Sequence, residues 1–174
     1  MDTISILAAL DENYLPQLQV MITSLYMNNP GERVRLYLLY SSIPEQKLAA
    51  VKKQCDSIEY AFYPILVDGD LFLGAPVTKQ YPREMYYRLL ASRLLPDTVE
   101  RVIYLDPDIL VINPLRPLWE LEMEGKLFAA AAHTGKTELA NRVNRVRLGS
   151  NSDYYNSGVL LMDLAAGRRG IRPE

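Results

Sequence analysis

Apolar runs of strand length alternate with helix-like segments along most of the chain, and this alternation limits the possible folds more than any other feature. The predicted strands are residues 3–10, 33–42, 57–65, 101–105, 126–133 and 154–164. The predicted helices are residues 11–31, 43–55 and 82–96, with a short helical turn at 117–121. Residues 69–82 are expected to form a loop, and residues 134–152 a loop or a loosely packed helix. Such alternation predicts an α/β fold with a mainly parallel sheet flanked by helices.

The first predicted helix carries recognisable signals of its start and of its buried face. Asp11 or Asn13 can cap it, and Pro16 suits its first turn. Four apolar residues recur at helical spacing and share one face: Leu15, Leu18, Ile22 and Leu25. Ser42 is a candidate cap for the second helix. We therefore expect the first helix to pack one apolar stripe against the sheet.

Length and composition favour one globular domain over residues 1–174. A chain of 174 residues is long enough to bury a sizeable core. No apolar span reaches the roughly 18 residues expected of a transmembrane helix, and MDTISILAAL lacks the basic start of a signal peptide. The net charge of -2, with few aromatic residues among the basic segments of the last third, argues against a nucleic-acid partner.

Cysteine and histidine are too scarce to build several kinds of site. Cys55, the single cysteine, cannot form an internal disulfide, which fits a cytoplasmic protein. It lies in a helical pattern without a neighbouring histidine, so we interpret it as a core or surface thiol and not as a nucleophile. His133 is the single histidine, and the chain therefore cannot assemble a zinc site from several histidines. No role is assigned to His133.

Asp106 and Asp108 stand one residue apart where the predicted strand 101–105 ends. Ligands of open parallel sheets bind at the carboxyl ends of the strands. Paired carboxylates at such an edge suit Mg²⁺ or Mn²⁺, and Pro107 between them fixes one backbone torsion. Taken alone, the Asp-Pro-Asp segment is also typical of a surface turn, and that interpretation is then the stronger one.

The segment after the first predicted strand offers a carboxylate, an amide and an aromatic ring within four residues. Asp11 and Asn13 can hydrogen-bond the edge of a planar base, and Tyr14 can stack on its face. Helix capping explains Asp11 or Asn13 equally well, so this segment alone does not identify a nucleotide site.

Two further segments contribute polar groups to the predicted ligand edge. Asn156 offers a polar contact, and Ser157 and Gly158 allow a ligand to approach the backbone. Arg88, in the helix before strand 101–105, can contact ligand oxygens. The alternative for Arg88 is an ordinary exposed arginine on a helix.

These segments in this order resemble family 8 of the glycosyltransferases, and the resemblance covers nearly all of the chain. It rests on ILAALDENY, YYRLLASRLLP, RVIYLDPDILVINPLRPLW and YYNSGVLLMDL. The resemblance implies a Rossmann-like GT-A fold and transfer of a hexose, from UDP-glucose or UDP-galactose, to an acceptor hydroxyl with retention. The implied acceptor is a glycan, a lipid-linked sugar or another hydroxyl compound, in lipopolysaccharide or cell-surface glycan synthesis at the inner face of the membrane.

The resemblance also gives each matching residue a role. Asp106 and Asp108 would bind Mn²⁺, or Mg²⁺, on the diphosphate of the UDP-sugar. Arg88 would contact the donor sugar or the diphosphate. The uridine would be held by Ala9, Asp11, Asn13 and Tyr14, with Tyr14 stacked on uracil. The donor sugar would lie against Asn156, Ser157 and Gly158.

The chain departs from the family pattern in one respect. Family members continue into a His-x-x-Gly-x-x-Lys segment, whose histidine completes the metal site, whereas this chain ends at Glu174. We therefore expect a C-terminally truncated GT-A domain with two protein ligands for the metal and no assigned catalytic residue. Apolar surface left uncovered is expected to favour a homo-oligomer.

Three alternatives compete with this interpretation. A haloacid-dehalogenase-like phosphatase also carries DxD after a strand, but the ILV that follows here does not fit it. A P-loop is excluded because Ala130 stands where the pattern ending in Gly135-Lys136-Thr137 requires glycine. A non-catalytic module that binds a UDP-sugar would retain Asp11, Tyr14 and the Asp-Pro-Asp segment, and it stays open as an alternative.

Overall fold

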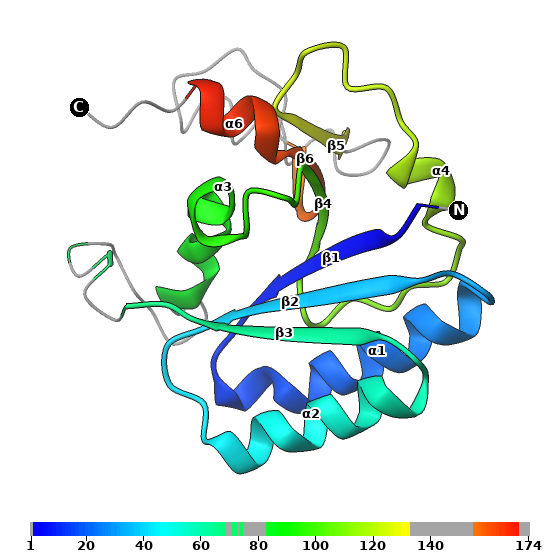
Figure 1. Cartoon of the computed structure of the whole chain (residues 1–174), viewed down its shortest axis with the longest axis vertical. Helices are drawn as coiled ribbons and strands as arrows, with labels where there is room; N and C mark the ends of the chain where they lie inside the picture. Colours follow the sequence, from blue (N-terminus) through cyan, green and yellow to red (C-terminus); the bar gives the residue numbers. More distant parts are fainter. Residues whose placement is uncertain (1, 69–70, 73, 75–82, 133–154, 171–174) are drawn as a thin grey trace, which may run out of the picture.

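A mixed sheet of six strands forms the centre of the computed structural model, which describes residues 2–68, 71–72, 74, 83–132 and 155–170 (Figure 1). The strand order is β3-β2-β1-β4-β6-β5. The bounds are β1 Ile4–Ala9, β2 Val34–Tyr40, β3 Ala61–Leu66, β4 Arg101–Leu105, β5 Phe128–Ala132 and β6 Tyr155–Asp163. Among these strands β1, β2, β3 and β4 pair in parallel, and β6 runs antiparallel to β4 and β5. The predicted α/β class with a mainly parallel sheet is confirmed.

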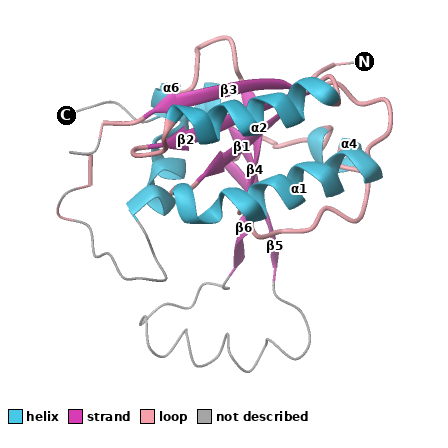
Figure 2. Ribbon diagram, turned by 90° about the horizontal axis from the view of Figure 1, so that it is seen from below, coloured by secondary structure: helices cyan, strands magenta, loops and turns pink. Residues whose placement is uncertain are grey.

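Helices cover both faces of the sheet (Figure 2). On one face lie α1 (Leu15–Asn28) and α2 (Glu45–Ser57), and on the other lie η2 (Arg83–Leu90), α3 (Ala91–Leu94) and α6 (Leu164–Gly170). All six residues of β1 are buried, as expected of a central strand with both faces covered.

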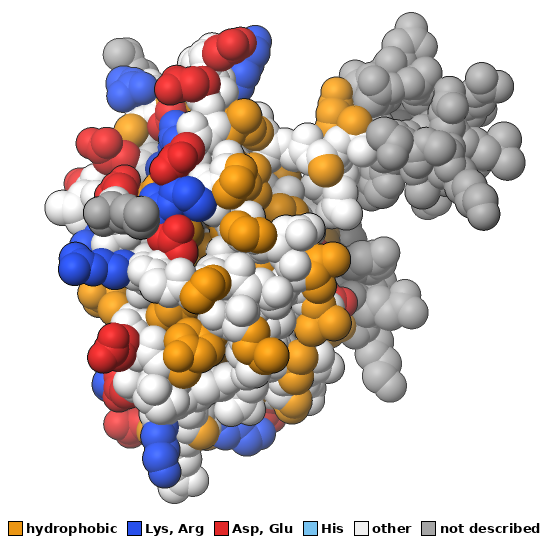
Figure 3. Space-filling view, turned by 90° about the vertical axis from the view of Figure 1, so that its right-hand side faces the viewer, with side chains coloured by type: hydrophobic (Ala, Val, Ile, Leu, Met, Phe, Trp, Pro, Cys, Tyr) orange, Lys and Arg blue, Asp and Glu red, His pale blue; other side chains and the backbone are white. Residues whose placement is uncertain are grey.

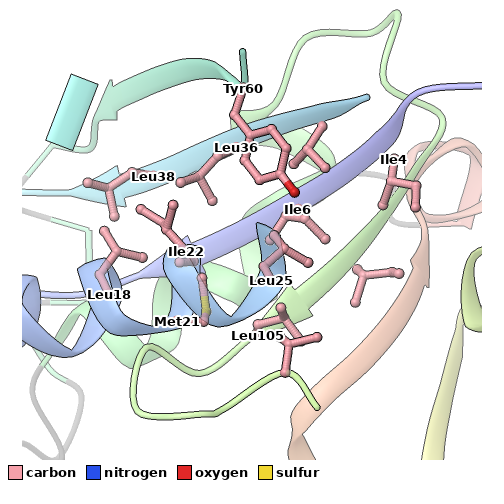
Figure 4. Packing of buried hydrophobic residues seen from close by; sticks show 14 of the residues in the cluster. Ile4, Ile6, Leu18, Met21, Ile22, Leu25, Leu36, Leu38, Tyr60 and Leu105 are labelled. Carbon is pink, nitrogen blue, oxygen red and sulfur yellow. The ribbon is translucent and has the colours of Figure 1, made fainter. Parts of the chain in front are cut away.

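Alternate residues of the strands divide the core into two clusters. Ile4, Ile6 and Ala8 of β1 belong to the cluster under α1 and α2, whereas Leu7 and Ala9 belong to the cluster under η2, α3 and α6. Figure 4 shows the first cluster, in which side chains of α1 point toward those of β1 and β2. The predicted face of α1 is confirmed, because its four members are all buried: Leu15, Leu18, Ile22 and Leu25.

The starts of the first two helices differ in detail from the prediction. Asp11 caps the short 3-10 turn η1 (Glu12–Tyr14), and α1 begins only after Tyr14. Pro16 lies in the first turn of α1, as predicted. The prediction of Ser42 as a cap is wrong, since α2 begins after Pro44 without a side-chain cap. The fixed torsion of Pro44 and its missing N–H suit a helix start on their own.

The predicted helix 82–96 is mostly a 3-10 helix. The eight residues of η2 precede a short α3 that ends before Pro96. Side chains three residues apart eclipse one another in a 3-10 helix, and the two buried residues of η2, Glu84 and Tyr87, have that spacing. The tighter winding therefore turns both side chains toward the sheet.

Other boundaries moved by a few residues. The predicted strand 57–65 begins late, because α2 runs to Ser57 and a turn with Glu59 at a φ of 59° precedes β3. The predicted turn at 117–121 corresponds to α4 (Arg116–Trp119).

His133 and the segment 134–152 lie outside the described residues, as does most of 69–82. No helix in the described part of the chain is long and apolar enough to cross a membrane.

Apolar side chains gather on the side of the molecule shown in Figure 3. Val20 and Met27 on α1, with Leu110 in the loop after β4, line a groove on the surface and are all exposed. Self-association through exposed apolar surface stays a prediction.

An ion pair joins α4 to the turn after α1. The Arg116 guanidinium donates two hydrogen bonds to the Glu32 carboxylate and one to the Asp2 carbonyl. Both charged side chains are largely buried, with 18% and 13% of their surface exposed. The hydrogen bonds from Arg116 hold the pKa of Glu32 below its ordinary value of 4.5. This contact fastens the segment after the Asp-Pro-Asp motif to the helical layer.

Glu32→Gln should therefore destabilise the fold by roughly 1–3 kcal/mol at neutral pH, because it removes the nearer of the two carboxylates that face the Arg116 guanidinium and leaves only the more exposed Glu120. A lowered carboxyl pKa stabilises the fold above about pH 4.5, and this stabilisation disappears as the pH falls through the lowered pKa. The difference between wild type and variant should shrink below that pH, as measured by urea denaturation. Glu122→Gln, at an exposed glutamate, is the control. A pH-independent difference would contradict the assignment.

Candidate functional site

The predicted ligand edge forms where β1 and β4 end side by side. Leu7 of β1 pairs with Tyr104 of β4, so Ala9 and Asp106 each lie two residues farther along adjacent parallel strands. The start of β6 reaches the same edge from the opposite direction, and the Asp106 N–H donates to the Gly158 carbonyl at 2.8 Å. The structure thus brings together two motifs that lie about 50 residues apart in the chain.

The Asp106 carboxylate is held by two donors from different elements. The Tyr104 hydroxyl donates to Asp106 Oδ1 at 2.7 Å, and the Arg88 guanidinium lies 3.4 Å from the same oxygen. Arg88 also donates to the Ser157 carbonyl at 2.9 Å. The Arg88 side chain is only 13% exposed, so it is not an ordinary exposed arginine of a helix. Arg88 links η2, the end of β4 and the start of β6.

Gly158 leaves room for the Asp106 carboxylate. A β-carbon at position 158 would stand 2.7 Å from Asp106 Oδ2 and 3.2 Å from Asn156 Oδ1. Asn156 in turn accepts a hydrogen bond from the Gly158 N–H at 2.8 Å. The missing side chain of Gly158 thus makes room for a side chain of the protein itself, and the approach of a ligand to this backbone stays a prediction.

Asp108 differs from Asp106 in its surroundings. Pro107 is buried, whereas Asp108 is exposed and makes no hydrogen bond or ion pair with the described residues. One acid of the pair is therefore fixed in the protein, and the other projects a free carboxylate into solvent.

Asp11, Asn13 and Tyr14 form a local structure of their own. The two carboxylate oxygens of Asp11 accept hydrogen bonds from the Asn13 backbone N–H at 2.9 Å and from its side-chain amide at 3.1 Å. Tyr14 is half-buried and packs against the core cluster under α1. Helix capping by Asp11, one of the two interpretations from sequence, is what the described contacts show. None of these contacts links the three residues to Asp106.

The sequence interpretation missed two buried polar residues near this edge. Tyr104 lies two residues before Asp106, a spacing that places both side chains on one face of a strand and could have identified it. Glu84 on η2 is buried and accepts a hydrogen bond from the Ser41 hydroxyl, just past the end of β2. Arg88, which also lies on η2, contacts Asp106 at the end of β4 and Ser157 at the start of β6. The helix η2 therefore lies across the strand ends from β2 to β6. No local sequence signal marks Glu84.

Two pKa shifts bear on the chemistry of these residues. Burial, and next the nearby Asp106 charge, raise the pKa of Tyr104 far above its ordinary value, so its hydroxyl keeps its proton at neutral pH. Burial raises the pKa of Cys55 to about 12. Cys55 is buried and is therefore a core thiol, one of the two interpretations from sequence, and not a nucleophile.

The acids at this edge fit a hard cation only in part. Carboxylate oxygens suit Mg²⁺ or Mn²⁺, which commonly take one or two carboxylates and complete their shell with substrate phosphates and water. No cluster of three or more His, Cys, Asp or Glu residues that could hold a metal occurs within the described residues. Asp106 and Asp108 match the one or two carboxylates that such an ion commonly takes from a protein.

Known proteins resemble this chain in sequence and in fold. The sequence model of Glycosyl transferase family 8 matches residues 5–170. The chain is 31% identical over 169 residues to the lipopolysaccharide 1,2-glucosyltransferase of Escherichia coli K12, covering 94% of this chain and 48% of the relative. It is 26% identical over 166 residues to general stress protein A of Bacillus subtilis 168, and the match covers 94% of this chain and 57% of that protein.

A solved structure shows the same fold. The crystal structure of the galactosyltransferase LgtC in complex with donor and acceptor sugar analogues matches with a TM-score of 0.85 and 28% identity. The match covers 97% of this chain and 60% of LgtC. The predicted GT-A fold is confirmed. The chain spans about half the length of the curated relatives that it matches.

Gly158→Ala should strain the Asp106 contact and destabilise the protein by about 1–3 kcal/mol, the usual cost of overpacking. Denaturation by urea measures the loss. Gly170→Ala is the matched control, because a β-carbon there meets nothing within 4 Å. Equal free energies of unfolding for the two variants would contradict the prediction, because they would show that Asp106 can move away from the added methyl group without loss of stability.

Proposed function

The chain belongs to glycosyl transferase family 8, and we propose that it binds a UDP-sugar and transfers a hexose to an acceptor hydroxyl with retention. The observation that carries this proposal is the joining of Asp106, Arg88 and the Ser157–Gly158 backbone at the carboxyl edge of the sheet. Because the chain matches only about half the length of its relatives, the activity, the substrates and the partners of the whole protein belong to the proposal.

The donor and acceptor classes follow from the relatives. LgtC was crystallised with analogues of a donor and an acceptor sugar, and the Escherichia coli relative is a lipopolysaccharide glucosyltransferase. We extend this to a UDP-hexose donor and a glycan, lipid-linked or other hydroxyl acceptor, in lipopolysaccharide or cell-surface glycan synthesis. Action in the cytoplasm at the inner face of the membrane is part of the same proposal.

Asp106 and Asp108 are the residues that would hold Mn²⁺, or Mg²⁺. When bound, the ion would supply Lewis-acid stabilisation of the charge that develops on the leaving UDP. Asp106 presents a carboxylate that Tyr104 and Arg88 already orient, and Asp108 presents a carboxylate with no competing partner among the described residues. The pair therefore combines one fixed ligand with one that can adjust.

Arg88 would supply a second positive charge for the diphosphate. Its guanidinium is anchored on the Ser157 carbonyl and over the ring of Tyr104, with the guanidinium carbon 5.1 Å from the ring centroid. A cation fixed in this way needs little reorganisation when phosphate oxygens arrive. The Asn156–Gly158 segment would meet the sugar, since it lies directly against Asp106.

The uridine would lie over the end of β1, against Ala9 and the segment from Asp11 to Tyr14. The exposed Asn13 side chain and the exposed part of the Tyr14 ring are available to a base. Asp11 would act mainly by holding Asn13, since both of its oxygens bind that residue.

A second candidate is a module that binds a UDP-sugar without turnover, which would use the same contacts of Asp106, Arg88 and the Ser157–Gly158 backbone. UDP binding without hexose transfer or UDP-sugar hydrolysis would support it. The phosphatase and P-loop alternatives are set aside by the family assignment.

Asp108→Asn should abolish most of the gain in UDP affinity that Mn²⁺ provides, because it removes the free carboxylate of the pair. Isothermal titration of UDP, with and without Mn²⁺, measures this gain in wild type and variant. Asp56→Asn, at the exposed end of α2, is the matched control and should behave as wild type. Equal UDP affinity under all conditions in wild type and variant would refute the metal-dependent site.

Tyr14→Leu should weaken UDP binding about 5- to 150-fold, since base–aromatic stacking contributes about 1–3 kcal/mol. Leucine keeps an apolar side chain against the core, so stability should change little. The gain from Mn²⁺ should remain, because Tyr14 does not contact Asp106. Unchanged UDP affinity would remove Tyr14 from the uracil site.

A further inference from the structure

We infer that Tyr104 is a positioning residue, which holds the Asp106 carboxylate in the orientation that binds the cation and the donor diphosphate. This inference rests on the proposed function, and it concerns a residue that does not itself reach the substrate. Three observations carry it: the burial of Tyr104, its hydrogen bond to Asp106, and the position of Arg88 over its ring.

Tyr104 is held rigidly. It is 1% exposed in the middle of the core cluster under η2, and its neighbours there include Ala9 and Tyr87. A side chain packed in this way has essentially one rotamer, so its hydroxyl marks a fixed point at the edge of the sheet. The distance of 2.7 Å to Asp106 Oδ1 is that of a good O–H···O hydrogen bond.

The hydroxyl helps to select which oxygen of Asp106 is available. Oδ1 accepts from Tyr104 at 2.7 Å and lies 3.4 Å from the Arg88 guanidinium, so two donors already face it. A carboxylate oxygen has about two lone-pair sites. Oδ2, which lies against Gly158, is therefore the oxygen left for a cation.

The same side chain also supports Arg88. The guanidinium carbon lies 5.1 Å from the centroid of the Tyr104 ring, within the range of a cation–π contact. The ring of Tyr104 thus contacts Arg88, and its hydroxyl binds Asp106. A phenylalanine at this position would keep the contact with Arg88 and lose the hydrogen bond to Asp106. This separation makes the role of the hydroxyl testable alone.

Tyr104→Phe is the test, with UDP titrated calorimetrically in the presence and absence of Mn²⁺. Residues that orient metal ligands typically contribute about 10- to 100-fold to metal affinity. We expect the Mn²⁺-dependent gain in UDP affinity to fall at least about tenfold, while metal-free UDP affinity and the urea midpoint stay near wild type.

Tyr60→Phe is the matched control. Tyr60 is also buried, but its hydroxyl has no hydrogen-bond partner in the described part of the chain, and it packs in the other core cluster. Both variants remove one buried hydroxyl and keep the ring. A loss of the Mn²⁺-dependent gain in Tyr104→Phe alone supports positioning.

Two results would overturn the inference. One is a full Mn²⁺-dependent gain in Tyr104→Phe. The other is an equal loss of UDP affinity with and without Mn²⁺, which would indicate a general structural role. In either case a wild-type chain that shows the gain leaves the proposed function standing. A wild-type chain without the gain would overturn the proposed metal site together with this inference.

Discussion

The burial of β1 on both of its faces is the constraint on which the rest of the structure depends. Helices α1 and α2 must cover one face, and η2, α3 and α6 the other, because apolar side chains project alternately from the strand. Parallel pairing with β2 and β4 then places the carboxyl ends of three strands at one edge. Polar residues that follow these strands gather there because the buried strands themselves exclude them.

The antiparallel return of β6 completes that edge. It delivers the backbone of Ser157 and Gly158 to the side of Asp106, where a larger residue than glycine would collide with the carboxylate. The 3-10 winding of η2 brings Arg88 to the same point while it buries Tyr87 and Glu84. The result is an edge with one oriented acid, one free acid and one anchored cation, and the proposed binding of a metal ion and an anionic donor rests on this combination.

Sequence patterns predicted the order of strands and helices and most of the residues that meet at the edge. Asp106, Arg88 and Gly158 were identified, and the structure joins them. The predictions from sequence that differ from the structure do so for local physical reasons. Ser42 offers a capping side chain, but Pro44 starts α2 by its backbone alone. The apolar spacing of residues 82–96 suits either kind of helix, and the segment that contacts β1 and β2, η2, adopts the tighter one.

The sequence by itself determined the α/β class, the buried strands and the position of the acids at a strand end, because each depends on neighbouring residues and on the periodicity of apolar side chains. The tertiary structure alone decided that Arg88 contacts a residue 18 positions away and another 69 positions away. Contacts of this kind depend on the direction of β6 and on the winding of η2. Both are set by packing across the whole sheet, which no local pattern encodes.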